Sequence, residues 1–184
     1  MKRQAGFTLI EVLATSAIAS ILAGALGSII HLCNVHIIDG NANIALSRGQ
    51  IVASEQIRRD GRNSYGVKKA GEDNTAITSA NTDPVQVGLS EIRFTEHDGD
   101  TLAAYRIANG RLEEYGETSP GVREFKPFCV GSDTVWLDAV NSDFKILPCR
   151  RGAVFNLRYK LVVGATTYTL PPLSETILCR NRYN

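Results

Sequence analysis

The chain has 184 residues, 43% of them apolar and 21% charged. This composition excludes an intrinsically disordered protein, and the length suits one ordinary domain plus an additional element. The net charge of +1 hides an asymmetry, because residues 71–143 are strongly acidic whereas residues 48–70 and 144–184 are basic.

The first predicted element is an apolar helix near the N-terminus. Residues 12–32 contain no Asp, Glu, Lys or Arg, and about 20 apolar residues in a helix span a bilayer. Lys2 and Arg3 precede this run, so the positive-inside rule predicts a cytoplasmic N-terminus and an exported remainder. Two alternatives are a cleaved signal peptide, with residues 23–25 as its processing site, and a plain single-pass anchor.

Glu11 is unusual because it is an acid at the start of this apolar helix. A carboxylate in a membrane helix is costly and usually has a partner, yet the helix encodes no cation nearby. Cleavage between Gly6 and Phe7 would create an α-amine on Phe7, one helical turn from Glu11. That amine could pair with Glu11 of the same chain or of a neighbouring copy.

The segment "GFTLIEVLATSAI" resembles the N-terminus of type IV pilins and type II secretion pseudopilins, with its basic leader, its Gly6-Phe7 cleavage pair and Glu11. The resemblance implies cleavage after Gly6 by a prepilin peptidase, which also N-methylates Phe7. It implies that Glu11 registers an incoming subunit during filament assembly. The expected partners are other pilin-like subunits, the peptidase and the inner membrane, with the head in the periplasm before assembly into a pilus or pseudopilus.

Helical character continues beyond the membrane segment, and we expect one helix over residues 8–62. Ile37, Ile44 and Ile51 recur at seven-residue spacing, and Ile57 extends the stripe. This stripe predicts the face that packs against a globular head, in preference to a coiled-coil seam. Two glycines, Gly24 and Gly27, stand where many major pilins carry a proline.

Strand and turn signals follow the helix. Residues 91–115 alternate apolar and polar side chains around two turn dipeptides, Asp98-Gly99 and Asn109-Gly110, which predicts a three-stranded meander. Residues 134–140 and 153–181 add strands, with a turn near Gly164, and residues 66–84 are predicted to form a loop. The expected fold class is α+β, a long helix packed on an antiparallel sheet.

These elements predict four segments: a leader at 1–6, a transmembrane or filament-core helix at 7–33, an amphipathic helix at 34–64 and a β-rich head at 65–184. The stretch "TLAAYRIANGRLEEY" resembles the meander of PilW-like minor pilins and J-type pseudopilins. That resemblance implies a minor subunit in a tip or initiation complex.

No residues indicate catalysis, a cofactor or a metal. Nucleophile-elbow, zinc-protease and phosphate-loop motifs are absent from the sequence. The acidic stretch "EHDGD" at 96–100 lacks the later glutamate of a calcium loop and is predicted to be a hairpin turn. The three histidines lack metal-ligand spacing, so we expect a structural protein.

The cysteines predict one disulfide in an oxidising compartment. Cys129 and Cys149 are the preferred pair, with Cys179 as an alternative partner for either, and sequence alone leaves all three pairings open. Cys33 lies at the outer end of the apolar run and is interpreted as an apolar filler.

The basic C-terminal residues raise the alternative of a DNA-capturing minor pilin. They are Arg150, Arg151, Arg158, Lys160, Arg180 and Arg182. The adjacent acidic segment offers these cations partners within the protein or in the next subunit. Such pairing is therefore favoured over nucleic-acid binding, and a membrane protein outside any filament is a further alternative.

Overall fold

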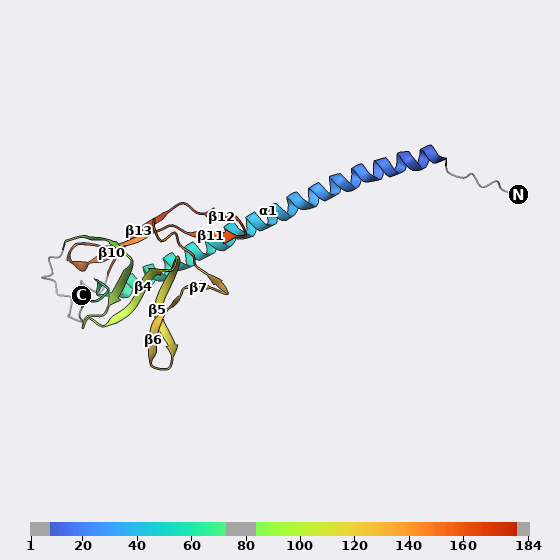
Figure 1. The fold of residues 1–184 in the computed structure, drawn as a ribbon. Coiled ribbons are helices and arrows are strands. Elements are labelled where there is room, and N and C mark those ends of the chain that lie inside the picture. Colours follow the sequence, from blue (N-terminus) through green and yellow to red (C-terminus); the bar gives the residue numbers. More distant parts are fainter. Residues whose placement is uncertain (1–7, 73–83, 180–184) are drawn as a thin grey trace. The chain divides into compact units, whose positions relative to one another are not determined.

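The computed structural model describes residues 8–72 and 84–179. The chain forms two compact units, residues 1–41 and 42–184. The first unit contains the beginning of helix α1, Leu9–Asn63, and the second contains the rest of α1 and all the strands (Figure 1). The predicted helix at 8–62 is thus confirmed to within one residue at each end, and it continues through Gly24 and Gly27.

The strands form antiparallel sheets, which confirms the α+β class. Sheet A has the order β1-β3-β4-β5-β6 and sheet B the order β13-β10-β9-β2, while β7-β8 and β11-β12 are separate hairpins. The strands of sheet A are β1 Gly66–Lys69, β3 Glu91–Thr95, β4 Thr101–Ala108, β5 Arg111–Ser119 and β6 Val122–Pro127. Those of sheet B are β2 Gln86–Leu89, β9 Asp143–Ile146, β10 Gly152–Leu157 and β13 Leu173–Leu178. The two hairpins are formed by β7 Cys129–Val130 with β8 Asp133–Thr134, and by β11 Lys160–Val163 with β12 Thr166–Thr169.

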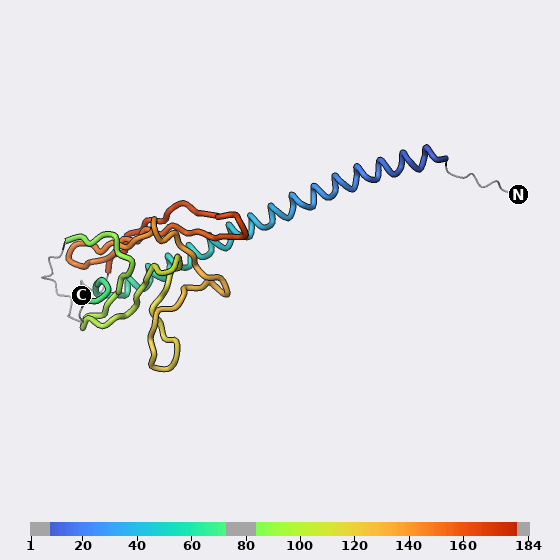
Figure 2. The backbone as a smooth tube through the Cα atoms, viewed as in Figure 1, coloured from blue at the N-terminus to red at the C-terminus, as the bar shows by residue number. Residues whose placement is uncertain are grey.

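Turn residues set the register of sheet A. Asn109 and Gly110 both have positive φ, 52° and 69°, as a two-residue hairpin turn requires, and Ala108 pairs with Arg111 across it. Gly99 (φ 94°) lies in the turn between β3 and β4. The predicted meander is therefore confirmed, and β6 extends it through a further hairpin that can be followed in Figure 2.

The second half of α1 packs against the sheets of the second unit through small and apolar residues. Its buried residues are Ala42, Leu46, Gly49, Ala53, Ser54, Ile57 and Gly61. Gly61 is required by close packing, since a Cβ there would lie 2.6 Å from Cγ2 of Ile177 and 3.1 Å from the ring of Phe94. These contacts place the helix against residues of both sheets.

The predicted isoleucine stripe is wrong as a docking face for the head. Ile57 is fully buried, but Ile44 and Ile51 are 66% and 61% exposed. The buried positions 42, 46, 49, 53, 57 and 61 follow three- and four-residue steps, and small residues among them let the helix approach the sheets closely. The seven-residue spacing of the isoleucines takes no account of alanine and glycine, so it predicted a different face of the helix.

Two strand predictions also need correction. Residues 66–69, expected in a loop, form β1, which pairs with β3 from Gly66–Thr95 to Lys69–Ile92. The strand expected at 134–140 is reduced to β8 and isolated bridges at Trp136 and Leu137. The remainder of the predicted loop, residues 73–83, lies outside the described residues.

Candidate functional site

The candidate site lies at the start of α1, where Thr8 and Glu11 bond to each other. The backbone N and Oγ1 of Thr8 each donate a hydrogen bond to Oε2 of Glu11, both at 2.9 Å. In return, the backbone N of Glu11 donates to Oγ1 of Thr8 at 3.4 Å. This reciprocal arrangement is a capping box, which satisfies backbone N–H groups that have no partner within the helix.

The capping box gives Glu11 a local partner that differs from the predicted cation. The threonine three residues earlier completes a Thr-x-x-Glu motif with this glutamate. Both described hydrogen bonds to the carboxylate end on Oε2. Within the described residues, Oε1 is thus left to accept a bond from another group. An amine on a neighbouring chain would be such a group.

The first part of α1 exposes large apolar side chains on all sides. Ile10 is 78% exposed and Ile21 72%. Among the described residues, α1 is the helix whose length and apolar character suit a membrane crossing, and its most apolar stretch has no buried residue. The surface is therefore suited to lipid or to other apolar helices.

Hydroxyl groups in this part of α1 bond to the helix itself. Thr15 Oγ1 donates to the carbonyl of Glu11 at 2.8 Å, Ser20 Oγ to that of Ser16 at 2.8 Å, and Ser28 Oγ to that of Gly24 at 3.0 Å. These bonds satisfy polar atoms that would be costly in hydrocarbon. The serines and threonines are thus compatible with an apolar environment.

Residues 1–27 match the family model of the prokaryotic N-terminal methylation motif. This match covers the basic leader, the Gly6-Phe7 pair, the Thr8–Glu11 capping box and most of the apolar run. The match supports the resemblance of this N-terminus to those of type IV pilins and pseudopilins. Comparison with curated proteins and with solved structures found no match.

The matched motif is that of chains N-methylated at their N-terminus. Gly6 and Phe7, the predicted cleavage and N-methylation residues, lie in the matched segment but outside the described residues. The apolar helix that follows is consistent with membrane anchoring. A motif of this kind points to a structural subunit.

The four cysteines of the chain lie in different surroundings. Cys129 is exposed on β7 and Cys33 is exposed on α1. Cys149 is half-buried in the 3-10 turn η1, Pro148–Arg150, and Cys179 is buried after β13. The structure contains no disulfide among these four described residues, so the preferred Cys129–Cys149 pairing is not confirmed and stays a prediction.

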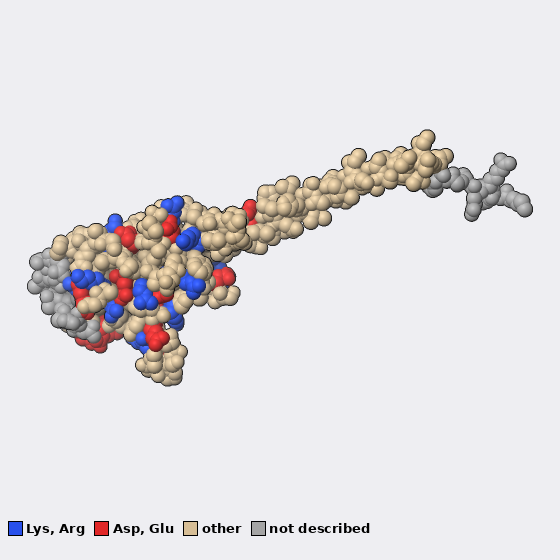
Figure 3. All heavy atoms as spheres, in the orientation of Figure 1, with Lys and Arg blue, Asp and Glu red and all other residues tan. Residues whose placement is uncertain are grey.

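Basic residues of α1 and of the head form ion pairs with acidic residues of the head. Arg150 pairs with Glu72, and Nη2 of Arg58 lies 2.8 Å from Oε2 of Glu175. This bond and the charge of Glu175 raise the pKa of Arg58. Figure 3 shows basic and acidic side chains interspersed on the visible face. The predicted pairing within the head is thus present for Arg150, while Arg180 and Arg182 lie outside the described residues.

The acidic stretch at 96–100 forms the predicted hairpin turn. The backbone N of Asp100 donates to Oδ1 of Asp98 at 3.0 Å, and Gly99 N donates to the carbonyl of Glu96 at 3.2 Å. Within residues 8–72 and 84–179, no three His, Cys, Asp or Glu side chains gather as metal ligands.

Proposed function

We propose that this chain is cut between Gly6 and Phe7, N-methylated on Phe7, and assembled through α1 into a type IV pilus or type II secretion pseudopilus. The observation that carries the proposal is the methylation motif joined directly to an apolar helix that is exposed on all sides. Such a surface is unfavourable in water, so it needs first lipid and then neighbouring helices.

Before assembly, residues 7–33 anchor the subunit in the inner membrane. Lys2 and Arg3 keep the leader in the cytoplasm, and residues 65–184 enter the periplasm as the head. The peptidase then acts at the cytoplasmic face, where the Gly6-Phe7 bond lies.

During assembly, Glu11 accepts the α-amine of Phe7 from a neighbouring subunit. An ion pair of this kind is strong where water is excluded, and it fixes the axial position of one helix against the next. The capping box supports this role, because all the described hydrogen bonds to the carboxylate end on Oε2. Thr8 thus orients the group that receives the amine.

The exposed side of the second half of α1 offers a further contact to a neighbouring subunit. Ile44, Ile51 and Val52 are 66%, 61% and 40% exposed, and they line two adjoining shallow grooves along the helix. Arg48 and Arg59 border these grooves. An apolar surface with a basic border fits a partner that presents apolar residues flanked by carboxylates.

We place the subunit in the initiation or tip complex of its filament, as a minor pilin or pseudopilin. The resemblance of residues 101–115 to PilW-like and J-type subunits supports this place. If this place is right, the subunit should be less abundant than the major pilin in purified filaments.

Replacing Glu11 tests the assembly role. Glu11→Ala should leave processing intact but reduce incorporation into sheared filaments at least tenfold, whereas Glu124→Ala, which changes an exposed glutamate on β6 away from these grooves, should assemble normally. Membrane-fraction and filament-fraction immunoblots give the ratio. Normal incorporation of Glu11→Ala would contradict the pairing role.

N-terminal mass spectrometry of the mature chain tests processing. The expected first residue is Phe7 carrying one methyl group. An intact leader would indicate a single-pass membrane protein outside any filament.

A further inference from the structure

We propose that Cys149 and Cys179 form a disulfide in the exported protein, joining the η1 turn to the end of β13. The proposal rests on the proposed function in one respect, namely that the head reaches an oxidising compartment. Sequence left three pairings open, and the contacts within the head distinguish them.

The pairing of β10 with β13 brings Cys179 next to η1. Gly152 pairs with Leu178, and one position further on the backbone N of Cys179 donates to the carbonyl of Arg151 at 2.9 Å. Paired residues in antiparallel strands have Cα atoms about 4.5 to 5.5 Å apart. Cys149 precedes Arg151 by two residues within the same turn, so the backbone brings both cysteines to one end of sheet B.

Side-chain contacts place the same two residues near the end of α1. Ser64, directly after α1, donates from Oγ to Sγ of Cys179 at 3.1 Å. Arg150, the neighbour of Cys149, pairs with Glu72, which follows β1 closely. Both cysteines therefore belong to the region where α1 ends and β1 begins.

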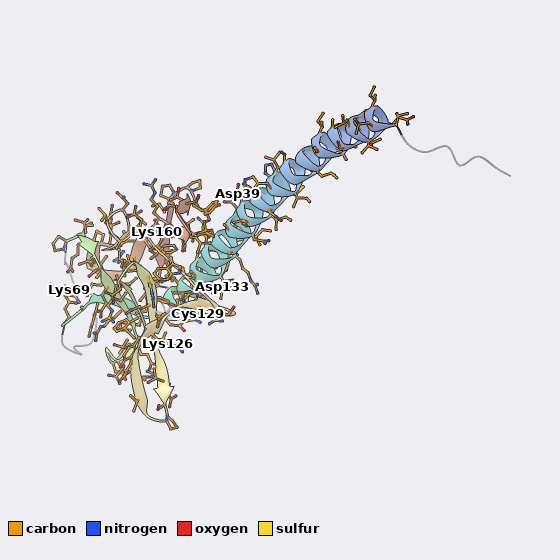
Figure 4. All side chains as sticks on the ribbon, turned by 45° about the vertical axis from the view of Figure 1, so that its right-hand side comes forward. Asp39, Lys69, Lys126, Cys129, Asp133 and Lys160 are labelled. Atoms are coloured by element: carbon orange, nitrogen blue, oxygen red, sulfur yellow. The ribbon has the colours of Figure 1, made fainter. Side chains whose placement is uncertain are left out.

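Cys129 belongs to a different part of the head. Its neighbour Val130 lines a cavity of about 230 Å³ together with Leu46 and Gly49. Gly49 and Ser64 are fifteen residues apart, a span of about 22 Å along a helix, whereas a disulfide needs Cα atoms about 4.4 to 6.8 Å apart. Figure 4 likewise shows Cys129 on the opposite side of the head from Lys69 of β1. These contacts argue against both pairings of Cys129.

The backbone of η1 supplies an independent argument. Cys149 and Arg150 have φ of 57° and 55°, a left-handed conformation that is unfavourable for residues with a Cβ. Such strain persists where surrounding contacts hold the chain in place. The ion pair with Glu72 and a 3.1 Å bond from Arg150 N to the carbonyl of Leu147 hold Arg150. A covalent bond from Cys149 would add a constraint on the same turn.

The reaction is a thiol–disulfide exchange. The two thiols lose two protons and two electrons as the Sγ–Sγ bond forms, and the disulfide of an exported thiol oxidoreductase is reduced to two thiols. Glutathione disulfide can take the same part in vitro and yields two glutathione molecules.

The bridge would close residues 149–179 into a loop that contains β10 to β13 and attach the last strand to its neighbour covalently. A loop of this size should raise the melting temperature by roughly 5 to 10 °C. Trp136, the single tryptophan of the chain, reports the unfolding of the head by fluorescence.

The connectivity is tested on the full chain in detergent micelles, oxidised with glutathione disulfide, alkylated with N-ethylmaleimide and digested with trypsin. We expect the peptide 146–150 linked to the peptide 161–180. A link from the peptide 124–145 to either of these, or alkylation of Cys149 and Cys179, would overturn the proposal.

Serine variants test the stabilisation. Cys149→Ser should lose the gain in melting temperature under oxidising conditions yet melt like the parent protein in dithiothreitol, and Cys129→Ser should keep the gain. An equal loss for Cys149→Ser in both conditions would show an effect of packing and overturn the proposal. A further measurement quenches cells with acid and alkylates their thiols. If the bridge forms in micelles but the protein from these cells contains only thiols, the pairing stands and the proposed export of the head is wrong.

Discussion

The two parts of α1 show how one helix is adapted to two environments. From Leu9 to Asn41 its large apolar side chains are exposed on every side, whereas from Ala42 to Asn63 one face is buried against strands. The first part is rich in large apolar residues all round, and the second buries mainly small residues. The distribution of apolar residues around the helix thus indicates whether its surroundings are lipid or protein. The size of the buried residues indicates how closely another element can approach the helix.

The sharpest test of this contrast is a pair of isoleucines on the second part of α1. Ile57→Ala should lower the free energy of unfolding of the head by about 3 kcal/mol, because it leaves a cavity in the core. Ile51→Ala should change it by less than about 0.5 kcal/mol, because that side chain is 61% exposed. Urea unfolding followed by Trp136 fluorescence measures both, and equal effects would refute the assignment of the two faces.

A buried hydroxyl tests the polar part of the same contact. Tyr105 OH donates to Oδ2 of Asp60 at 2.6 Å, and burial raises the pKa of Tyr105, so its proton stays in place at physiological pH. Tyr105→Phe should cost about 2 kcal/mol, since the acceptor is a carboxylate. Tyr115→Phe on β5 serves as the control in the same unfolding assay and should be near neutral.

Glycine substitutions probe the two parts of α1 with one chemical change. Gly61→Ala should destabilise the head by about 1 kcal/mol, because overpacking against Ile177 and Phe94 exceeds the gain in helix propensity. Gly27→Ala, whose added Cβ would meet no atom within 4 Å beyond its own stretch of helix backbone, should leave head stability unchanged. A stabilised Gly61→Ala head would mean that Ile177 can move aside.

The smallest expected effect concerns the start of α1. Thr8→Ala removes the side-chain half of the capping box and should cost about 0.5 to 1 kcal/mol locally. Amide hydrogen exchange in the first turn should become roughly two- to five-fold faster, and Thr8→Ser should restore the parent rate. Unchanged exchange in Thr8→Ala would exclude a stabilising cap.

The sequence was sufficient for features encoded by local rules. The ends of α1, the turns at Asn109-Gly110 and Gly164 and the meander all follow from periodicity and turn chemistry. The prepilin motif was recognisable because cleavage pair, glutamate and apolar run occur together.

The remainder depends on contacts between distant segments. The buried face of α1 is defined by alanine and glycine, which carry little hydrophobic signal, and Gly61 can be understood only beside Ile177 and Phe94. The β1 strand, "GVKK", has no strong alternation and is formed by its partner β3. At the candidate site, Thr8 was missed although its motif is local, because a cation was expected as the partner.

The order of strands in sheet A also bears on how the head folds. From β3 to β6 each strand pairs with the next in sequence, so these contacts form with little loop-closure entropy. By contrast, β2 pairs with β9, which is distant in sequence, and Gln86 lies opposite Ile146. We expect the meander to form first and the second sheet to close later, and amides of β4 should be protected before those of β9 in pulse-labelled exchange. The early structure of such a chain is one local hairpin series, in which each strand finds its partner without waiting for a distant segment.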